Sequence, residues 1–177
     1  MKYRNTYNSK LGLIYLESNG KYLTGLWFAS SKDSLKHQDN YLIKDLPIFK
    51  ETKKWLDLYF SSKIPDFTPK YKLENLTPFR KMVTDIMLTI PYGEVITYGD
   101  IAKEIAKKRG LKKMSSQAVG QAVGHNPICL IIPCHRVIGQ NYNLTGYGGG
   151  IENKVKLLEI ENHDLSKFTI PQRRKTL

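Results

Sequence analysis

The chain has 177 residues, of which 41% are hydrophobic and 25% are charged. These fractions are those of an ordinary globular protein, and the length allows one medium domain or two small ones. No apolar run is long enough to cross a bilayer, and the first seven residues lack the apolar region of a signal peptide. We therefore expect a cytoplasmic protein that has no membrane partner.

The formal net charge is +12 and the isoelectric point is near 9.6, which favours polyanionic partners. Six basic residues stand within eleven positions and are opposed only by Glu104: Lys103, Lys107, Lys108, Arg109, Lys112 and Lys113. A solvated helix face followed by a polar loop would account for this run as well as a nucleic-acid contact does. Because the run adjoins a predicted helix-turn-helix, we favour contacts with phosphate groups.

The first seventy or so residues form a unit rich in predicted strands. Two β-type runs, 11–16 and 22–28, flank Asn19-Gly20, a pair that accepts positive φ at both turn positions and indicates a tight hairpin. The pattern becomes helical over 46–60, where Pro47 suits a helix start. We expect the aromatic residues of this unit to form its core, and we see no chemistry in it.

A stretch with two prolines and few apolar residues, 61–69, has the composition of a connector. We place the domain boundary between about Lys70 and Asn75. The second unit begins with a helix for which Thr77 is the expected cap and Pro78 the first residue, and it ends at Pro91-Tyr92-Gly93. Its apolar residues recur at spacings of three and four, which predicts a face in the core.

Two short helices are predicted next, on either side of the basic loop. The first covers about 98–107 with Thr97 as its cap, and the second is capped by Ser115 or Ser116. The second is rich in small residues, which would let its backbone approach DNA closely. Short helix pairs of this kind are typical of a helix-turn-helix, although they also occur in many other proteins.

The segment that carries the most chemistry is Pro133-Cys134-His135, which follows an apolar run over 128–132 that we predict to be a buried strand. A thiol becomes a good nucleophile when a nearby base favours its thiolate. Successive side chains of a strand point to opposite sides, so His135 would reach Cys134 only through a turn or a bridging water. Cys129, the second cysteine, is expected to be an inert buried thiol, and we expect no disulfide.

A metal site is a further possibility for this region, because His125, Cys129, Cys134 and His135 are potential ligands. Their spacing matches no regular zinc pattern. We therefore predict no metal here.

The residues from Asn126-Pro127 through Ile131-Ile132-Pro133-Cys134-His135-Arg136-Val137-Ile138-Gly139, followed by Thr145-Gly146-Tyr147-Gly148-Gly149-Gly150, resemble the O6-alkylguanine-DNA alkyltransferases, also called methylated-DNA–protein-cysteine methyltransferases. The resemblance runs from about Thr77 to Leu165 and is most specific around Cys134. It implies an α+β protein with three parts. These are an amino-terminal ribonuclease H-like domain of sheet plus helix over 1–72, a mainly helical, winged-helix-like domain with a helix-turn-helix over 76–165, and a basic tail over 166–177.

The implied activity is direct-reversal DNA repair, in which an alkyl group moves from O6 of guanine, and less readily from O4 of thymine, onto Cys134. The resemblance makes His135 the base that acts through a water, with Glu161 orienting the imidazole as in a triad. From the sequence alone, Glu161 would be an exposed carboxylate near the end of a predicted helix over 152–161. Tyr98 would assist the leaving group, and Asn126 would brace the turn beside the cysteine.

The resemblance also implies a pocket for a base that has been flipped out of the duplex, since a stacked base cannot present its O6 for in-line attack. The pocket residues would be Val137, Tyr147, Gly148 and Gly149, with Lys154 nearby. The second helix would enter the minor groove, and the residues expected to contact DNA are Ser115, Ser116, Gln117, Ala118, Gly120, Gln121, Gly124 and Arg136. Many relatives carry an arginine where this chain has Gln117, which predicts weaker support of the flipped state.

The implied partner is double-stranded DNA that carries alkylated guanine or thymine, and no cofactor is expected. S-methylcysteine is a thioether without a carbonyl for water to attack, so each protein should accept one alkyl group. Residues 1–75 contain no cysteine, so the structural zinc of some relatives is not expected. A monomer is the default expectation.

Three other functions remain compatible with parts of the pattern: a DNA-binding regulator that senses redox state through Cys134, a non-enzymatic binder of alkyl lesions, and a cysteine hydrolase. The basic tail residues Arg173, Arg174 and Lys175 could contact DNA or be disordered.

Overall fold

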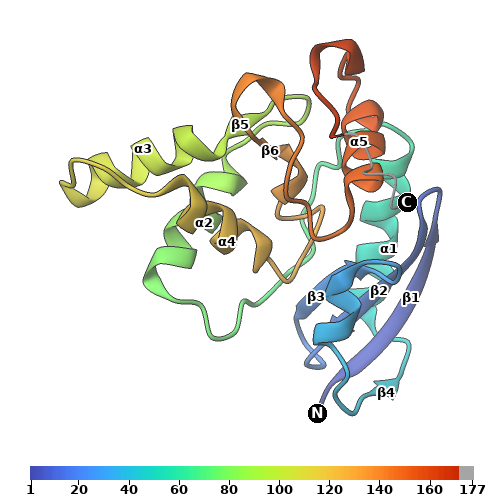
Figure 1. Cartoon of the computed structure of the whole chain (residues 1–177). Helices are drawn as coiled ribbons and strands as arrows, with labels where there is room; N and C mark the ends of the chain where they lie inside the picture. Colours follow the sequence, from blue (N-terminus) through green and yellow to red (C-terminus); the bar gives the residue numbers. More distant parts are fainter. Residues whose placement is uncertain (172–177) are drawn as a thin grey trace, which may run out of the picture.

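The computed structural model describes residues 1–171, so Arg173, Arg174 and Lys175 of the basic tail lie outside the described residues. The chain is an α+β protein, as predicted, with a sheet in its amino-terminal part and most helices in the remainder (Figure 1). The sheet has the order β3-β2-β1-β4. Its strands are β1 (Tyr3–Ser9), β2 (Gly12–Ser18), β3 (Leu23–Phe28) and β4 (Leu42–Ile43). The first three are antiparallel, and β4 runs parallel to β1.

The predicted hairpin over 11–28 is confirmed as β2 and β3, but its turn differs from the prediction. Four residues separate the strands, and of the Asn19-Gly20 pair only Gly20 has a positive φ, of 104°. The Asn19 side chain closes the turn by accepting hydrogen bonds from the backbone N–H groups of Lys21 and Tyr22. The prediction of positive φ at both positions was therefore wrong, because this asparagine side chain replaces part of the backbone turn.

Helix α1 (Pro47–Phe60) begins one residue after the predicted start and has Pro47 in its first turn. Its buried face packs against β1 and β2, so its aromatic residues are in the core, as predicted. In Figure 1 the helix runs alongside the sheet and reaches α5 (Ile151–Ile160). Residues after α1 make this contact directly, because the Ser62 hydroxyl donates to the carbonyl oxygen of Ile160.

The outer edge of β3 is bonded to two later segments of the chain. Leu23 donates to the carbonyl of Lys70 and accepts from the N–H of Lys72, both at 2.9 Å. Further along the strand, Leu26 donates to the carbonyl of Pro127 at 2.9 Å and accepts from the N–H of Cys129 at 3.0 Å. One strand edge therefore fixes the beginning of the second half of the chain and also the segment that leads to Cys134.

The helices of the second half are α2 (Pro78–Leu88), α3 (Tyr98–Arg109), α4 (Ser116–Gly124) and α5. The expected caps are confirmed: the side chains of Thr77, Thr97 and Ser115 each accept a hydrogen bond from a backbone N–H in the first turn that follows. Helices α2, α3 and α4 pack on one another, and a short parallel pair, β5 (Ile96–Thr97) and β6 (Val137–Ile138), lies beside them. None of the helices within residues 1–171 is long and apolar enough to span a membrane.

The strand predicted over 128–132 is absent. Only Ile128 forms a bridge, to Leu26, and the chain then turns tightly. Leu130 has φ of +70°, which an extended strand does not allow, and the N–H of Ile132 bonds back to the carbonyl of Ile128. The apolar residues are buried as expected, but they lie in a tight turn and not in a strand. An apolar run in the sequence does not distinguish a buried strand from a buried turn.

Candidate active site

Cys134 begins a 3₁₀ turn that covers Cys134–Arg136, and its side chain is 5% exposed. Asn126 braces the approach to this turn from both ends: its amide nitrogen donates to the carbonyl of Ile132 at 2.8 Å, and its amide oxygen accepts from the N–H of Ile128 at 3.1 Å. Asn126 therefore lies where the resemblance placed it, and it holds the backbone that leads into Cys134.

Three groups stabilise the thiolate form of Cys134. The hydrogen bond from the Cys129 thiol has the largest effect, followed by the Asn126 side chain and the charge of Lys154, and together they lower the pKa of Cys134 although burial opposes them. Cys129 was expected to be inert. Instead its thiol contacts the candidate nucleophile, and the same interaction together with burial raises the pKa of Cys129. Of the two thiols, Cys134 is thus the one that ionises more readily and is the better nucleophile.

His135 bonds to Glu161, which follows α5 as its capping residue. Both side chains are fully buried, so the sequence-based expectation of an exposed Glu161 was wrong. Burial lowers the pKa of His135 in spite of the neighbouring carboxylate, which keeps the ring neutral near pH 7. Its Nε2 faces Glu161, and its Nδ1 is buried without a hydrogen-bond partner among residues 1–171.

Glu161 is held by donors on both of its oxygens. Arg136 Nε donates to Oε1 at 2.7 Å and the N–H of Gly93 donates to the same oxygen at 3.1 Å. Burial alone would raise the pKa of Glu161, but the hydrogen bonds and charges of His135 and Arg136 outweigh it and lower this pKa to about 2. The carboxylate is therefore ionised throughout the neutral range.

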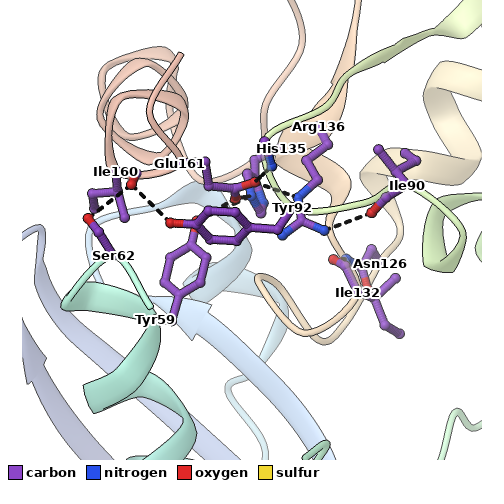
Figure 2. Close-up of polar contacts among 11 residues, drawn as sticks. Tyr59, Ser62, Ile90, Tyr92, Asn126, Ile132, His135, Arg136, Ile160 and Glu161 are labelled. Carbon is purple, nitrogen blue, oxygen red and sulfur yellow. Dashed lines mark hydrogen bonds and ion pairs between the residues drawn. The ribbon is translucent and has the colours of Figure 1, made fainter. Parts of the chain in front are cut away.

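Arg136 was predicted to contact DNA, and in this structure its side chain bonds inside the protein. Its guanidinium is bonded to Glu161 and, through Nη1, to the carbonyl of Ile90 at 2.8 Å, and the residue is 9% exposed (Figure 2). It also lies over the ring of Tyr92. A guanidinium committed to an internal carboxylate is not free for a phosphate, so Arg136 belongs to the support of the His135–Glu161 pair.

Tyr59 is a site residue that sequence reasoning missed. It lies in α1, in the unit where no chemistry was expected, and its hydroxyl donates to Glu161 Oε2 at 2.8 Å (Figure 2). The same hydroxyl is 3.3 Å from His135 Nε2. The helical pattern correctly placed Tyr59 on the buried face, but no local signal shows that a buried tyrosine reaches a carboxylate 102 positions later.

Lys154 and Tyr98 hold the loop that follows β6. The Lys154 ammonium donates to the carbonyls of Val137 at 2.6 Å and Thr145 at 3.1 Å. The Tyr98 hydroxyl donates to the carbonyls of Thr145 at 3.2 Å and Gly146 at 3.3 Å. Burial lowers the pKa of Lys154 to about 8, and burial together with the nearby Cys134 raises that of Tyr98 to about 12.

The predicted pocket residues Tyr147, Gly148 and Gly149 gather beside Cys134 around a space of about 10 Å³, which we name the acceptor cavity. It is lined by Asp33, Val123, Gly124, Asn126, Cys129, Cys134, Gly146, Tyr147, Gly148 and Gly149. A cavity of this size holds about one water molecule, far less than a purine. Val137 lies outside this lining and acts through its carbonyl bond to Lys154.

The two glycines are required by close neighbours. A Cβ on Gly148 would lie 2.8 Å from Asp33 Oδ2, and one on Gly149 would lie 2.6 Å from the ring of Tyr147. Tyr147 itself is 9% exposed, and its hydroxyl is buried without a partner among residues 1–171. The tyrosine and the two glycines thus line the same small cavity as the thiol, and they leave little room in it.

A larger and more open hollow of about 670 Å³, which we name the α4 groove, lies next to the acceptor cavity. It is lined by Tyr98, Gly99, Ser116, Gln117, Gly120, Gln121, Gly139, Gln140, Thr145 and Gly146. The predicted DNA-contacting residues of this helix are mostly at the surface: Ser115, Ser116, Gln117, Gln121 and Gly124 are exposed, and Ala118 and Gly120 are half-buried. Gly146 lines both hollows, so the surface groove and the acceptor cavity adjoin at this residue.

The described residues contain no group of three or more His, Cys, Asp or Glu side chains placed to hold a metal ion. The basic residues of 103–113 are exposed on the end of α3 and the loop after it. Two of them make local contacts: Lys108 pairs with Glu104 at 3.2 Å, and Arg109 lies over the ring of Phe79. The remainder of the run is free to meet a polyanion.

Comparison with known proteins agrees with this geometry. Residues 2–73 match the family model "6-O-methylguanine DNA methyltransferase, ribonuclease-like domain", and residues 78–163 match "6-O-methylguanine DNA methyltransferase, DNA binding domain". The chain is 38% identical over 161 residues to a methylated-DNA–protein-cysteine methyltransferase of Mycobacterium tuberculosis, covering 91% of this chain and 93% of that protein. It is 39% identical over 163 residues to the protein of the same description from Methanosarcina barkeri, covering 92% and 99%.

Solved structures give the same result. The chain superposes on the crystal structure of Mycobacterium tuberculosis OGT in complex with DNA with a TM-score of 0.78 and 37% identity, over 94% of each chain. It superposes on O6-methylguanine-DNA methyltransferase from Pyrococcus kodakaraensis with a TM-score of 0.66 and 26% identity, over 92% of this chain and all of that one. Both halves of the chain and the arrangement around Cys134 thus lead to one conclusion: the chain belongs to the 6-O-methylguanine DNA methyltransferase family.

Proposed function

We propose that the chain repairs DNA by direct reversal, taking an alkyl group from O6 of guanine, and less readily from O4 of thymine, onto Cys134. The observation that carries this proposal is a thiol whose pKa is lowered, followed directly by His135, which forms a fully buried pair with Glu161 at the end of α5. The relatives named above are methyltransferases that act on a protein cysteine, which supports the same reaction here.

The reaction begins with loss of the Cys134 proton. Glu161 is an ionised acceptor, so the proton on His135 stays on Nε2 and the lone pair is on Nδ1. We propose that Nδ1 takes up the thiol proton through a water molecule, since it is a buried nitrogen with no partner among the described residues. Glu161 and Arg136 then stabilise the imidazolium that forms.

The thiolate attacks the alkyl carbon in line with the O6–carbon bond. A sulfur–carbon bond forms, the carbon–oxygen bond breaks, and the electron pair passes to the purine, which takes up a proton from water and becomes guanine again. The thiol proton held on His135 is released to water, so the protons balance. Tyr98 keeps its own proton at neutral pH because its pKa is about 12, so it can donate a hydrogen bond to the leaving base. The product at Cys134 is a thioether, which water does not hydrolyse, so one protein accepts one alkyl group.

We propose that double-stranded DNA binds along the α4 groove, with Ser115, Ser116, Gln117 and Gln121 at its surface. The complex of the Mycobacterium tuberculosis relative with DNA supports this partner. Gly120 and Gly124 keep the helix narrow at this face. The flipped base would pass Tyr98 and Gly146 to reach the acceptor cavity. Because this cavity is only about 10 Å³, Tyr147 has to move away from the thiol before a purine fits.

We further propose two domains, 1–72 and 76–165, that act as a monomer in the cytoplasm without a cofactor. Both cysteines are free thiols, which suits a reducing compartment. The proposed reaction consumes only the alkylated base and the protein.

The test is mass spectrometry after mixing the protein with a duplex oligonucleotide that contains O6-methylguanine. The expected result is one added methyl group on the Cys134 peptide, absent in Cys134→Ala, and no turnover beyond one methyl per protein. Tight binding of the lesion without methyl transfer would instead show a lesion binder, and reversible oxidation of Cys134 without transfer would show a redox-sensing regulator.

A further inference from the structure

We propose that Tyr59 is a positioning residue for alkyl transfer: its hydroxyl, which comes from the amino-terminal part of the chain, fixes the Glu161 carboxylate and thereby the tautomer and basicity of His135. This inference rests on the proposed role of His135 as the base. It assigns the amino-terminal part a direct connection to the reaction, in addition to its packing role.

Three polar atoms meet in the interior of the protein. The Tyr59 hydroxyl is 2.8 Å from Glu161 Oε2 and 3.3 Å from His135 Nε2, and the same Oε2 is the atom that His135 contacts (Figure 2). All three residues are at most 2% exposed. With Arg136 and Gly93 on Oε1, each carboxylate oxygen receives two donors. The carboxylate therefore has little freedom to rotate.

The directions of these hydrogen bonds follow from the charge of Glu161. Its pKa is about 2, so at neutral pH both oxygens only accept. Burial and the nearby carboxylate raise the pKa of Tyr59 well above its ordinary value, so the phenol keeps its proton and directs it at Oε2. His135 must then present Nε2–H to the same oxygen. The tautomer that remains has its lone pair on Nδ1, which is the nitrogen left for the Cys134 proton.

Tyr59 also limits how basic His135 becomes. Two donors share Oε2, and the Tyr59 hydroxyl withdraws part of the negative charge that would otherwise act on the imidazole alone. Without that hydroxyl, Glu161 would attract the protonated ring more strongly and the pKa of His135 would rise. More of the protein would then hold His135 already protonated, a form that cannot accept the thiol proton.

The ring of Tyr59 is held independently of its hydroxyl. It stacks on Trp55 with ring centroids 5.4 Å apart and an interplanar angle of 5°, and it meets Phe60 and Tyr92 edge-on. Phenylalanine at this position keeps these contacts and removes only the oxygen. Tyr59→Phe is thus a test of the hydrogen bond and leaves the packing in place.

Tyr7→Phe is the matched control. The Tyr7 hydroxyl also donates to a carboxylate of α1, Asp57 Oδ1 at 2.7 Å, and its ring packs on Phe60, but this pair is at the surface and away from Cys134. Each variant loses one tyrosine–carboxylate hydrogen bond that has one partner in α1. A difference between them therefore reports on the position of Tyr59.

The experiment measures single-turnover methyl transfer from an O6-methylguanine duplex to Cys134 between about pH 5 and pH 9, a range in which an imidazole base titrates. For Tyr59→Phe we expect transfer at pH 7 to be about tenfold slower, the size of effect that a hydrogen bond to a charged group produces. The acid limb of its pH profile should move to higher pH, while Tyr7→Phe retains the rate and profile of the unmodified chain. Equal profiles for the two variants would overturn the inference.

A second measurement reads the tautomer of His135 in the unmodified chain, which does not depend on how well Tyr59→Phe folds. Nitrogen-15 NMR of the imidazoles, with His135→Gln to assign the signal, reports the tautomer and titration of His135 directly. We expect Nε2–H in the unmodified chain and a raised pKa of His135 in Tyr59→Phe; an unchanged titration contradicts the role given to Tyr59. If the unmodified protein transfers no methyl group at all, the proposed function fails, whereas normal transfer with an unaffected Tyr59→Phe refutes only this inference.

Discussion

Lys154 is fully buried, and its ammonium group donates a 2.6 Å hydrogen bond to the carbonyl oxygen of Val137. A buried lysine is costly unless its donors are used, and here they link β6 to the loop at Thr145. The same charge stabilises the thiolate of Cys134. Lys154 thus joins the shape of the acceptor cavity to the reactivity of the thiol within it.

Lys154→Met should remove the ammonium group, with its hydrogen bonds and its charge near Cys134, while keeping an unbranched side chain of similar length. We expect the pKa of Cys134 to rise and methyl transfer at pH 7 to slow by about tenfold or more, because a charged donor bonded to two carbonyls contributes on that scale. The measurement is the rate of methyl transfer to Cys134 as a function of pH. Lys156→Met, at an exposed position of the same helix, serves as the control and should leave the rate unchanged; equal rates for the two variants would disprove the role of Lys154.

Cys129→Ala should raise the pKa of Cys134, since the hydrogen bond from the Cys129 thiol is the largest of the interactions that lower it. The pH dependence of iodoacetamide labelling, read by mass spectrometry of the Cys134 peptide, measures this pKa. Cys129→Ser keeps a hydrogen-bond donor and should restore most of the labelling at pH 7. If alanine and serine behave like the unmodified protein, the contact between the two thiols has no chemical consequence.

Glu161 contributes stability that depends on pH in a defined direction. Its folded-state pKa of about 2 lies below the ordinary value of 4.5, so the contribution is fully present above pH 4.5 and is lost as the pH falls toward 2. Glu161→Gln should lower the free energy of unfolding by a few kcal/mol at neutral pH, because Arg136 is left buried without its carboxylate. Denaturant unfolding across this pH range gives both quantities.

Glu159→Gln is the control for Glu161→Gln, since Glu159 is an exposed carboxylate one residue before the end of α5. The unmodified chain and Glu159→Gln should lose stability steeply between pH 4.5 and 2, and Glu161→Gln should show a shallower dependence there. Equal slopes in all three proteins would mean that Glu161 is not the carboxylate responsible.

Gln117→Arg should speed transfer from duplex DNA. Gln117 is exposed in the α4 groove, and an arginine there would add a cation where a base leaves the stack. We expect about a tenfold faster single-turnover rate, because flipping costs a few kcal/mol and a cationic side chain recovers part of it. Gln121→Arg adds the same charge one turn later and separates this effect from general attraction to DNA.

The free base O6-methylguanine needs no flipping, so its rate of reaction should be equal in Gln117→Arg and the unmodified chain. An unchanged rate and affinity on duplex DNA would show that glutamine at this position is no handicap.

The helices of the second half could be predicted from the sequence because their signals are local. Thr77, Thr97 and Ser115 each precede an apolar repeat, and each caps the expected helix. Strand β1 was not predicted, since its sequence YRNTYNS is largely polar and only its pairing with β2 makes it a strand. Local propensity determines the first kind of element, and tertiary pairing determines the second.

The site divides in the same way. Cys134 could be identified from its own neighbourhood in the sequence, whereas Glu161 was found only through the family resemblance. Tyr59 and Arg136 show what neither route supplied: one comes from the other half of the chain, and the other turns inward to a carboxylate instead of outward to DNA. Contacts between residues distant in sequence carry no periodicity, so pattern reasoning does not detect them.

The bonded edge of β3 has a mechanical consequence. Leu26 uses its N–H to bond to Pro127 and its carbonyl to bond to Cys129, which is five residues before the nucleophile. A strand of the amino-terminal sheet therefore anchors the backbone from which the chain turns toward the sulfur of Cys134. The two halves of the chain should consequently unfold together, and exchanging one half for that of a distant relative would misplace the thiol even if each half folded well.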